Sequence, residues 1–224
     1  MNTELSRPIV VTADGSSSVY NPDVGQHYHS IFGARQESER VFIELGLAAA
    51  FERFAGPLRV FEMGFGTGLN ALLTAHLAQQ TQRPVSYTTV EAYPLPADVT
   101  RQLNFDRLIG SQLLQPLHDA PWETPVAISP YVTLLKRHGF LRDVAPPEPV
   151  HLVYYDAFAP EGQPELWTEE TFRHVASFMR PGGLLTTYCA KGYVQRNLRA
   201  AGFTVEKHPG PARKREVLRA VAPA

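Results

Sequence analysis

Three groups of residues have types and spacing suited to ligand chemistry. The first is the segment from Glu62 to Gly68, whose glycines allow a tight turn and a close approach of the backbone to a ligand. The second is Glu91, twenty-three residues after Gly68, where a carboxylate can accept hydrogen bonds from both hydroxyls of a ribose. The third is Asp156, which follows an apolar run and can accept a proton. Together they predict a site for a cofactor that contains ribose.

The spacing of the glycines indicates the cofactor class. The dinucleotide fingerprint is G-x-G-x-x-G, whereas here the third glycine comes one residue early. This spacing disfavours a nicotinamide oxidoreductase and favours the E-x-G-x-G-x-G pattern of S-adenosylmethionine-dependent methyltransferases; a glycine cluster that binds nothing is the alternative. We expect Glu62 to face the methionine end of the cofactor, the turn to pack against its ribose and methionyl portions, and Glu91 to hold the ribose. The predicted cofactor-binding residues are Glu62, Gly64, Phe65, Gly66, Thr67, Gly68, Asn70 and Glu91.

A framework of strands and helices must bring these residues together. Apolar periodicity predicts helices over 36–54, 69–80, 168–179 and 193–201, and strands over 58–61, 85–90, 131–135, 151–155 and 184–189. We also expect short strands and loops over 1–35, irregular helix over 93–122, and a closing hairpin over 203–206 and 216–221. This order predicts a doubly wound, Rossmann-like α/β fold with a mostly parallel sheet and an antiparallel C-terminal hairpin, and with the glycine spacing it indicates the class I methyltransferase form of that fold. Ligands bind such sheets at the carboxyl ends of the strands, where all three groups fall.

The chain resembles a specific family. It is similar to the methyltransferase half of the bacterial bifunctional tRNA wobble-uridine modification enzyme (MnmC type) and to its stand-alone homologues (MnmD type). The most specific motifs are EMGFGTGLN at 62–70 and YDAFAP at 155–160, joined by Tyr28-His29-Ser30, TYCAKG at 187–192 and Lys214-Arg215-Glu216. The resemblance implies a tRNA N-methyltransferase that uses S-adenosyl-L-methionine to convert wobble 5-aminomethyl-2-thiouridine to 5-methylaminomethyl-2-thiouridine.

Two departures from the family pattern change what the resemblance implies. The bifunctional enzyme carries a flavin-dependent oxidase domain, and this chain stops at Ala224, so we expect methylation without flavin. The family usually has Gly-Asp after the third strand, where the acid can take the adenine amino group, whereas Gly139-Phe140 align here. The adenine contact is therefore left unassigned.

Asp156 is the predicted catalytic residue. Methyl transfer from a sulfonium needs a neutral acceptor nitrogen, yet a free alkylamine has a pKa of ~10.4 and is almost fully protonated at neutral pH. A carboxylate at a strand end can orient the amine and accept its proton. The alternative is a carboxylate that only caps the following turn. Phe158 and Pro160 are expected to wall the acceptor pocket, and Phe158 can stack on a flipped base or simply belong to the core.

The N-terminal segment is expected to add a lid or acceptor wall. Residues 1–35 are interpreted as an extension that packs on a methyltransferase domain over 36–224, with Tyr28 and His29, together with Asp14 and Glu37, facing the acceptor. His27 and His29 lie two apart and share one face of a strand. A metal site needs further ligands that the sequence does not offer, so we predict no metal.

The charge of the chain is unevenly distributed. The formal net charge is −1, but residues 180–224 carry nine Lys and Arg against two Asp and Glu, a balance of +7, and residues 1–179 carry −8. A solvated basic face is the ordinary interpretation of such a run. We favour contact with tRNA phosphates because the basic triplet precedes the last strand. The predicted substrate-binding residues are Tyr28, His29, Phe158, Pro160, Lys191, Arg213, Lys214 and Arg215.

The sequence also bears on the location of the protein. Cys189 is the single cysteine, and the sequence shows neither a signal peptide nor an apolar run long enough for a membrane helix, so we expect a cytoplasmic protein that contacts no membrane.

One alternative function is methylation, or aminopropyl transfer, on a small amine. Aminopropyl transfer needs a second acid near Asp156, which residues 157–160 do not supply. The other alternative is a non-catalytic tRNA-binding module.

Overall fold

The glycine-rich segment forms the predicted strand, turn and helix. In the computed structural model, β4 (Leu58–Met63) ends at the glycine turn and α3 (Leu69–Thr81) begins directly after it. The structure describes residues 7–211 and 214–223. The local sequence fixes this unit because an apolar strand, a glycine turn and a helical run follow one another without a gap.

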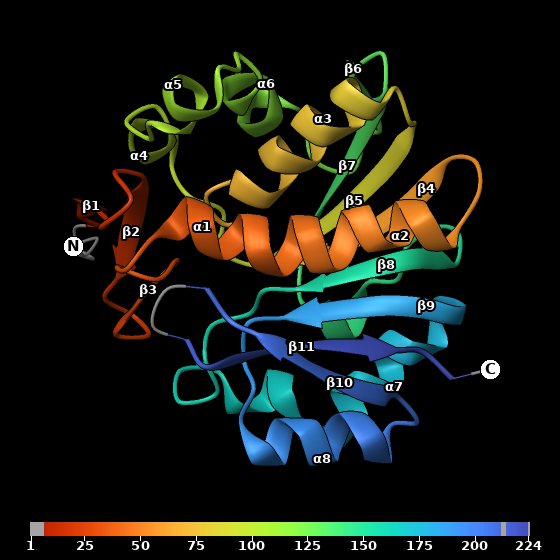
Figure 1. Ribbon diagram of the computed structural model, residues 1–224. Coiled ribbons are helices and arrows are strands. Elements are labelled where there is room, and N and C mark those ends of the chain that lie inside the picture. Colours follow the sequence, from red (N-terminus) through yellow and green to blue (C-terminus); the bar gives the residue numbers. More distant parts are fainter. Residues whose placement is uncertain (1–6, 212–213, 224) are drawn as a thin grey trace.

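The described part of the chain forms an eight-stranded central sheet in the order β10-β11-β9-β8-β4-β5-β7-β6 (Figure 1). Neighbours from β9 to β7 pair in parallel, whereas β6, β11 and β10 pair antiparallel. The other strands are β5 (Val85–Glu91), β6 (Val126–Ser129), β7 (Val132–His138), β8 (Val150–Tyr155), β9 (Met179–Thr187), β10 (Thr204–Pro209) and β11 (Glu216–Val221). This arrangement confirms the predicted Rossmann-like α/β fold, including its antiparallel C-terminal hairpin.

Helices cover both faces of the sheet. One face carries the run α1 (Ala34–Ser38), η1 (Glu39–Ala48) and α2 (Ala49–Arg53), together with α3, α4 (Ala97–Thr100), α5 (Phe105–Ile109) and α6 (Leu114–Asp119). The other face carries η3 (Pro164–Trp167), α7 (Glu169–Ser177) and α8 (Gly192–Ala200); η2 (Leu141–Asp143) follows β7. Figure 1 shows the first run lying lengthwise across the sheet and α7 and α8 beyond the opposite side.

The sheet strands are buried on both faces, and alternate residues enter two different cores. Val60 of β4 and Tyr154 of β8 belong to the core under η1 and α3, whereas Phe61 and Tyr155 belong to the core under α7 and α8. This period of two is the geometry of an extended strand. η1, which is π-helical, packs closely on the sheet at Gly46, where a Cβ would lie 3.2 Å from the Tyr154 ring.

The structure differs from the predicted elements in two places. β6 lies over 126–129, a stretch that the sequence interpretation left without a strand, because this short apolar run becomes ordered only by pairing with β7. β9 starts at Met179, which we assigned to the preceding helix because its apolar spacing continues the helical period. The Pro-Gly-Gly segment at 181–183 therefore lies within β9, at a register shift opposite β8 where Gly182 has a φ of +71°.

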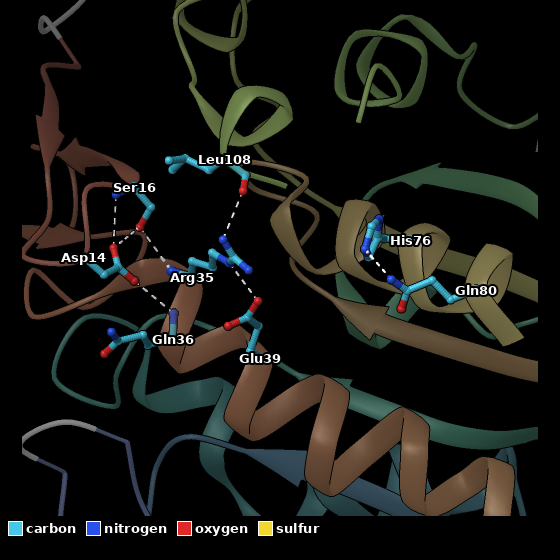
Figure 2. A network of polar contacts seen from close by, with 8 residues as sticks. All are labelled: Asp14, Ser16, Arg35, Gln36, Glu39, His76, Gln80 and Leu108. Atoms are coloured by element: carbon cyan, nitrogen blue, oxygen red, sulfur yellow. Dashed lines mark hydrogen bonds and ion pairs between the residues drawn. The ribbon is translucent and has the colours of Figure 1, made fainter. Parts of the chain in front are cut away.

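Residues before α1 form a separate small sheet of β1 (Ile9–Val11), β2 (Ser17–Asn21) and β3 (Gln26–His27). Asp14 joins this sheet to the helix, since its carboxylate accepts from Ser16 and from the Gln36 amide at 3.0 Å (Figure 2). Arg35 donates to Glu39 and to the Leu108 carbonyl in the same view. No helix in the described chain is long and apolar enough to cross a membrane.

Candidate active site

The carboxyl ends of β4 and β8 bring the glycine turn next to Asp156. The two strands pair in parallel with Met63 opposite Tyr155, and the Asp156 amide donates to the Met63 carbonyl at 3.2 Å. Gly64 has a φ of +89°, and a Cβ there would lie 3.1 Å from the Asp156 carbonyl oxygen. A larger residue would therefore be strained and would crowd the neighbouring strand end.

Glu91 holds the glycine turn at the end of β5. Its Oε2 accepts from the Gly66 amide at 3.0 Å and its Oε1 from the Tyr93 amide at 2.8 Å. A Cβ on Gly66 would lie 2.9 Å from Cδ1 of Tyr28, so the turn is packed between the N-terminal segment and β5. A carboxylate oxygen can accept more than one hydrogen bond, so Glu91 can still receive ribose hydroxyls.

A cavity of about 670 Å³ opens at this edge of the sheet. That volume lies within the range of small-molecule sites. The predicted residues that line it are Tyr28, His29, Gly64, Phe65, Gly66, Thr67, Asn70, Glu91, Asp156, Phe158 and Lys214. The predicted residues Glu62, Gly68, Pro160, Lys191 and Arg215 lie outside the described lining, and Arg213 lies outside the described residues.

Asp156 presents to this cavity a carboxyl group whose pKa is raised above its ordinary value. Desolvation by the surrounding protein raises its pKa to about 7, although a hydrogen bond from Asn70 lowers that pKa. The charge of Glu37 raises the pKa further and that of Lys214 lowers it. Asn70 Nδ2 donates to Asp156 Oδ2 at 2.8 Å. Near neutral pH this group can both accept and release a proton.

Glu62 lies beneath the glycine turn and not on the cavity surface. Its side chain is only 1% exposed, and burial together with the charge of Asp156 raises its pKa to about 8. Hydrogen-bonding groups of Asn70, Tyr87 and Thr89 partly offset that rise. Glu62 therefore keeps its proton at neutral pH. Its expected contact with the methionine end of a cofactor stays a prediction.

The N-terminal segment forms one side of the cavity. The ring of Tyr28 meets that of Phe158 edge to face, with the ring centres 4.9 Å apart. Gln26 Oε1 accepts from the Ala159 amide at 2.9 Å and so fixes the loop after Asp156. Gln26 carries no sequence signal of its own, because its role depends on pairing between segments 133 residues apart.

The glycine turn is also held by two histidines. His29 Nε2 lies 2.6 Å from the Thr67 hydroxyl, and His118 Nε2 lies 3.0 Å from the Thr67 carbonyl. Burial lowers the pKa of both histidines to about 4, so both rings are neutral at pH 7. Lys136, 1% exposed, donates to the His118 carbonyl at 2.6 Å and lies over the Trp122 ring. His118 and Lys136 escaped the sequence interpretation because nothing local marks them.

Lys214 turns inward to the cavity. Its Nζ lies 2.7 Å from Oε2 of Glu37, a residue only 7% exposed, and 4.1 Å from the centre of the Tyr188 ring. Tyr188 donates in turn to the Ala157 carbonyl at 2.8 Å. The ion pair therefore joins the segment before β11 to α1 beside Asp156.

The remaining predicted residues lie nearer the surface. Lys191 is exposed and pairs with Glu161, and Arg215 is exposed beside the hairpin. Phe140 packs edge to face against Tyr93, a cavity residue, with ring centres 6.1 Å apart. In the described residues, no three His, Cys, Asp or Glu side chains cluster so that they could hold a metal ion.

Comparisons with known proteins agree with this geometry. A family model described as S-adenosyl-L-methionine-dependent methyltransferase matches residues 136–223. The tRNA 5-methylaminomethyl-2-thiouridine biosynthesis bifunctional protein MnmC of Delftia acidovorans is 32% identical over 97% of this chain and 35% of its own length. The protein of the same name from Pseudomonas fluorescens is 34% identical over 86% of this chain and 31% of its own length. The chain thus spans about a third of the length of these curated relatives.

Solved structures give a consistent result. The crystal structure of MnmC2 from Aquifex aeolicus matches 98% of this chain and 71% of its own, with a TM-score of 0.77 and 25% identity. Spermidine synthase from Thermotoga maritima, at 13% identity and a TM-score of 0.54, covers 92% of this chain and shares the fold. In its sequence and fold, the chain is thus similar to the methyltransferase part of MnmC proteins and to the S-adenosyl-L-methionine-dependent methyltransferase family whose model it matches.

Proposed function

We propose that the protein is a tRNA N-methyltransferase that converts wobble 5-aminomethyl-2-thiouridine to 5-methylaminomethyl-2-thiouridine with S-adenosyl-L-methionine. The observation that carries the proposal is that the glycine turn, Glu91 and Asp156 face one cavity. The names of the relatives support the tRNA substrate. A tRNA substrate would also place the protein in the cytoplasm.

The residues of the cavity fit the cofactor. Glu91 would hold the ribose, and the backbone of Gly66, whose amide donates to Glu91, would lie beside it. Tyr93 and Phe140 would stack on the adenine in place of the missing acid. Bound there, the cofactor supplies a methyl group on a positively charged sulfur.

Asp156 would prepare the acceptor. An alkylammonium must lose a proton before its nitrogen can form a bond to the methyl carbon, and the carbon–sulfur bond breaks as that bond forms. Because its pKa is raised to about 7, Asp156 can accept the proton and release it to solvent afterwards. Partial desolvation in the cavity also lowers the pKa of the amine, which helps the transfer.

Aromatic and basic groups would receive the tRNA. Tyr28 and Phe158 offer ring faces and edges to an extruded wobble base. Lys191 and Arg215 are exposed cations that can contact phosphates, and we retain Arg213 in this role from the sequence alone. Pro160 follows Phe158 in the same loop and would limit how far that loop moves.

The test is transfer of a labelled methyl group. Purified protein is incubated with labelled S-adenosylmethionine and either tRNA that carries the aminomethyl precursor, the same tRNA without it, or spermidine and other small amines. We expect transfer only to the precursor tRNA. Asp156→Asn should lower kcat by ~10²–10⁴-fold, whereas Asp98→Asn, an exposed acid on α4, should leave it unchanged.

The three arms separate the alternative functions. Transfer to a small amine but not to tRNA would replace the proposed substrate while keeping the reaction class. Binding of tRNA without any transfer would favour the non-catalytic tRNA-binding module. An unchanged rate in Asp156→Asn would remove Asp156 from the chemistry.

A further inference from the structure

Asn70 connects the helix after the glycine turn to the carboxylate of Asp156. It is the second residue of α3, is only 3% exposed, and donates from Nδ2 to Asp156 Oδ2 at 2.8 Å. Among the described residues, this is the one side-chain hydrogen bond that the Asp156 carboxylate receives. A donor to a carboxylate stabilises its charged form, so loss of this bond would favour protonation.

The Asn70 amide lies in a buried polar environment beside Glu62. Asn70 Oδ1 and both carboxyl oxygens of Glu62 are buried, without a geometric hydrogen-bond partner in the described structure. Glu62 lies close enough to Asn70 for the amide to influence its pKa, which burial raises to about 8. The hydrogen bond that is formed by the Asn70 side chain in the described residues is the one from Nδ2 to Asp156.

Charged or titratable groups reach Asp156 from five segments. Glu62 comes from β4, Tyr87 from β5, Glu37 from α1, Lys214 from the segment before β11 and Tyr188 from the position after β9. Glu37 and Lys214 pair with each other at 2.7 Å, so their effects on Asp156 oppose one another. Asn70 is thus the uncharged donor that remains to favour the carboxylate form.

We propose that Asn70 is a positioning residue, whose buried amide favours the ionised form of the Asp156 carboxylate and holds it turned toward the acceptor. This goes beyond the expected role of Asn70 as a cofactor contact. Its kinetic consequence rests on the proposed function, because Asp156 acts there as the base. Its effect on the acidity of Asp156 does not need a substrate.

The primary experiment is a carboxyl ¹³C NMR titration of Asp156 in protein without cofactor or tRNA. Asn70→Ala should raise the pKa of Asp156 by about one to two units, the usual effect of a hydrogen bond to a charged group. Thr74→Val is the matched control, because it removes a buried hydrogen bond to Tyr154 one turn further along α3 and should leave the Asp156 titration unchanged. Asn70→Asp, which keeps the side-chain volume, is the second variant and should raise the pKa further.

The second readout is the pH dependence of methyl transfer. In Asn70→Ala the acid limb of kcat should move to higher pH by the same amount as the NMR titration, and the rate should recover toward wild type near pH 9. An unmoved Asp156 titration in both variants would overturn the proposal. So would an equal loss of rate at every pH with a raised KM for S-adenosylmethionine, which is what a cofactor contact alone would give. A moved titration in a protein that methylates no tRNA would instead contradict the proposed function.

Discussion

At the scale of single residues, Glu91 shows how one side chain can serve structure and ligand together. Its two carboxylate oxygens receive amides from the glycine turn and from the segment after β5. The carboxylate therefore shapes the turn before any ligand arrives. Such preorganisation lowers the entropic cost of ordering the site when the ligand binds.

We therefore expect Glu91→Ala to weaken cofactor binding more than the loss of ribose contacts alone would. The Gly66 and Tyr93 amides lose their acceptor, so the turn loses its shape as well. Isothermal titration calorimetry with S-adenosylmethionine should show a Kd at least ~100-fold higher, since each charged hydrogen bond contributes ~1.5–3 kcal/mol. Glu170→Ala, an exposed acid on α7, is the control; an equal effect in both variants would contradict this role.

At the scale of elements, the ion pair between Lys214 and Glu37 joins two segments that are far apart in sequence. The Glu37 side chain is 9% exposed and that of Lys214 is 33% exposed. Removal of the lysine would leave a carboxylate in a poorly hydrated place, which costs more than loss of a surface pair. The pair thus contributes to the attachment of the C-terminal hairpin to α1.

We expect Lys214→Ala to lower the free energy of unfolding by ~1–2 kcal/mol, a value reduced for the partial exposure of the lysine. Lys191→Ala breaks the more exposed pair with Glu161 and should cost under ~0.5 kcal/mol. Urea denaturation of both variants measures the difference. Glu37→Gln combined with Lys214→Met should cost less than the two single changes added together. Equal costs for Lys214→Ala and Lys191→Ala would show that the inner pair is no stronger.

Some of the contacts between elements could be predicted from the sequence, and others could not. The glycine turn and Asp156 could be expected to meet, because both follow apolar strands and parallel strands end at one edge. The ion pair of Lys214 with Glu37 could not be expected, since the net charge of a segment does not tell which carboxylate a lysine will contact. His118 and Lys136 support the turn from α6 and β7, and only long-range packing brings them there. β6 was missed for the same reason.

At the scale of the whole molecule, buried titratable groups limit the pH range of stability. Burial raises the pKa of Asp156 to about 7 and that of Glu62 to about 8, so both lose protons in the folded state only at higher pH than in the unfolded chain. Burial lowers the pKa of His29 and His118 to about 4. The two carboxyls therefore make the free energy of unfolding fall as pH rises toward their pKa values in the folded state. The two histidines make it rise with pH, but only up to pH ~6.5, where the unfolded chain has lost the same protons.

We therefore predict that stability falls as pH rises from 6.5 to 8, where only the carboxyls still titrate among these four groups. Glu62→Gln should remove part of this fall, on the order of 1–2 kcal/mol, because a buried amide has no proton to lose. Urea denaturation at both pH values, with Glu52→Gln on α2 as an exposed control, measures it. A fall of the same size in Glu62→Gln would assign the effect to other groups.

The cavity is lined both by Tyr28 and His29, which precede α1, and by Lys214, which precedes β11. During synthesis on a ribosome, the first of these residues emerges long before the last. A nascent chain can form the glycine turn and the strands around it before the Lys214 side of the cavity exists, because that side depends on the pairing of β11 with β9. A chain cut before β10 would therefore leave this side of the cavity open, although the glycine turn and Asp156 were already in place.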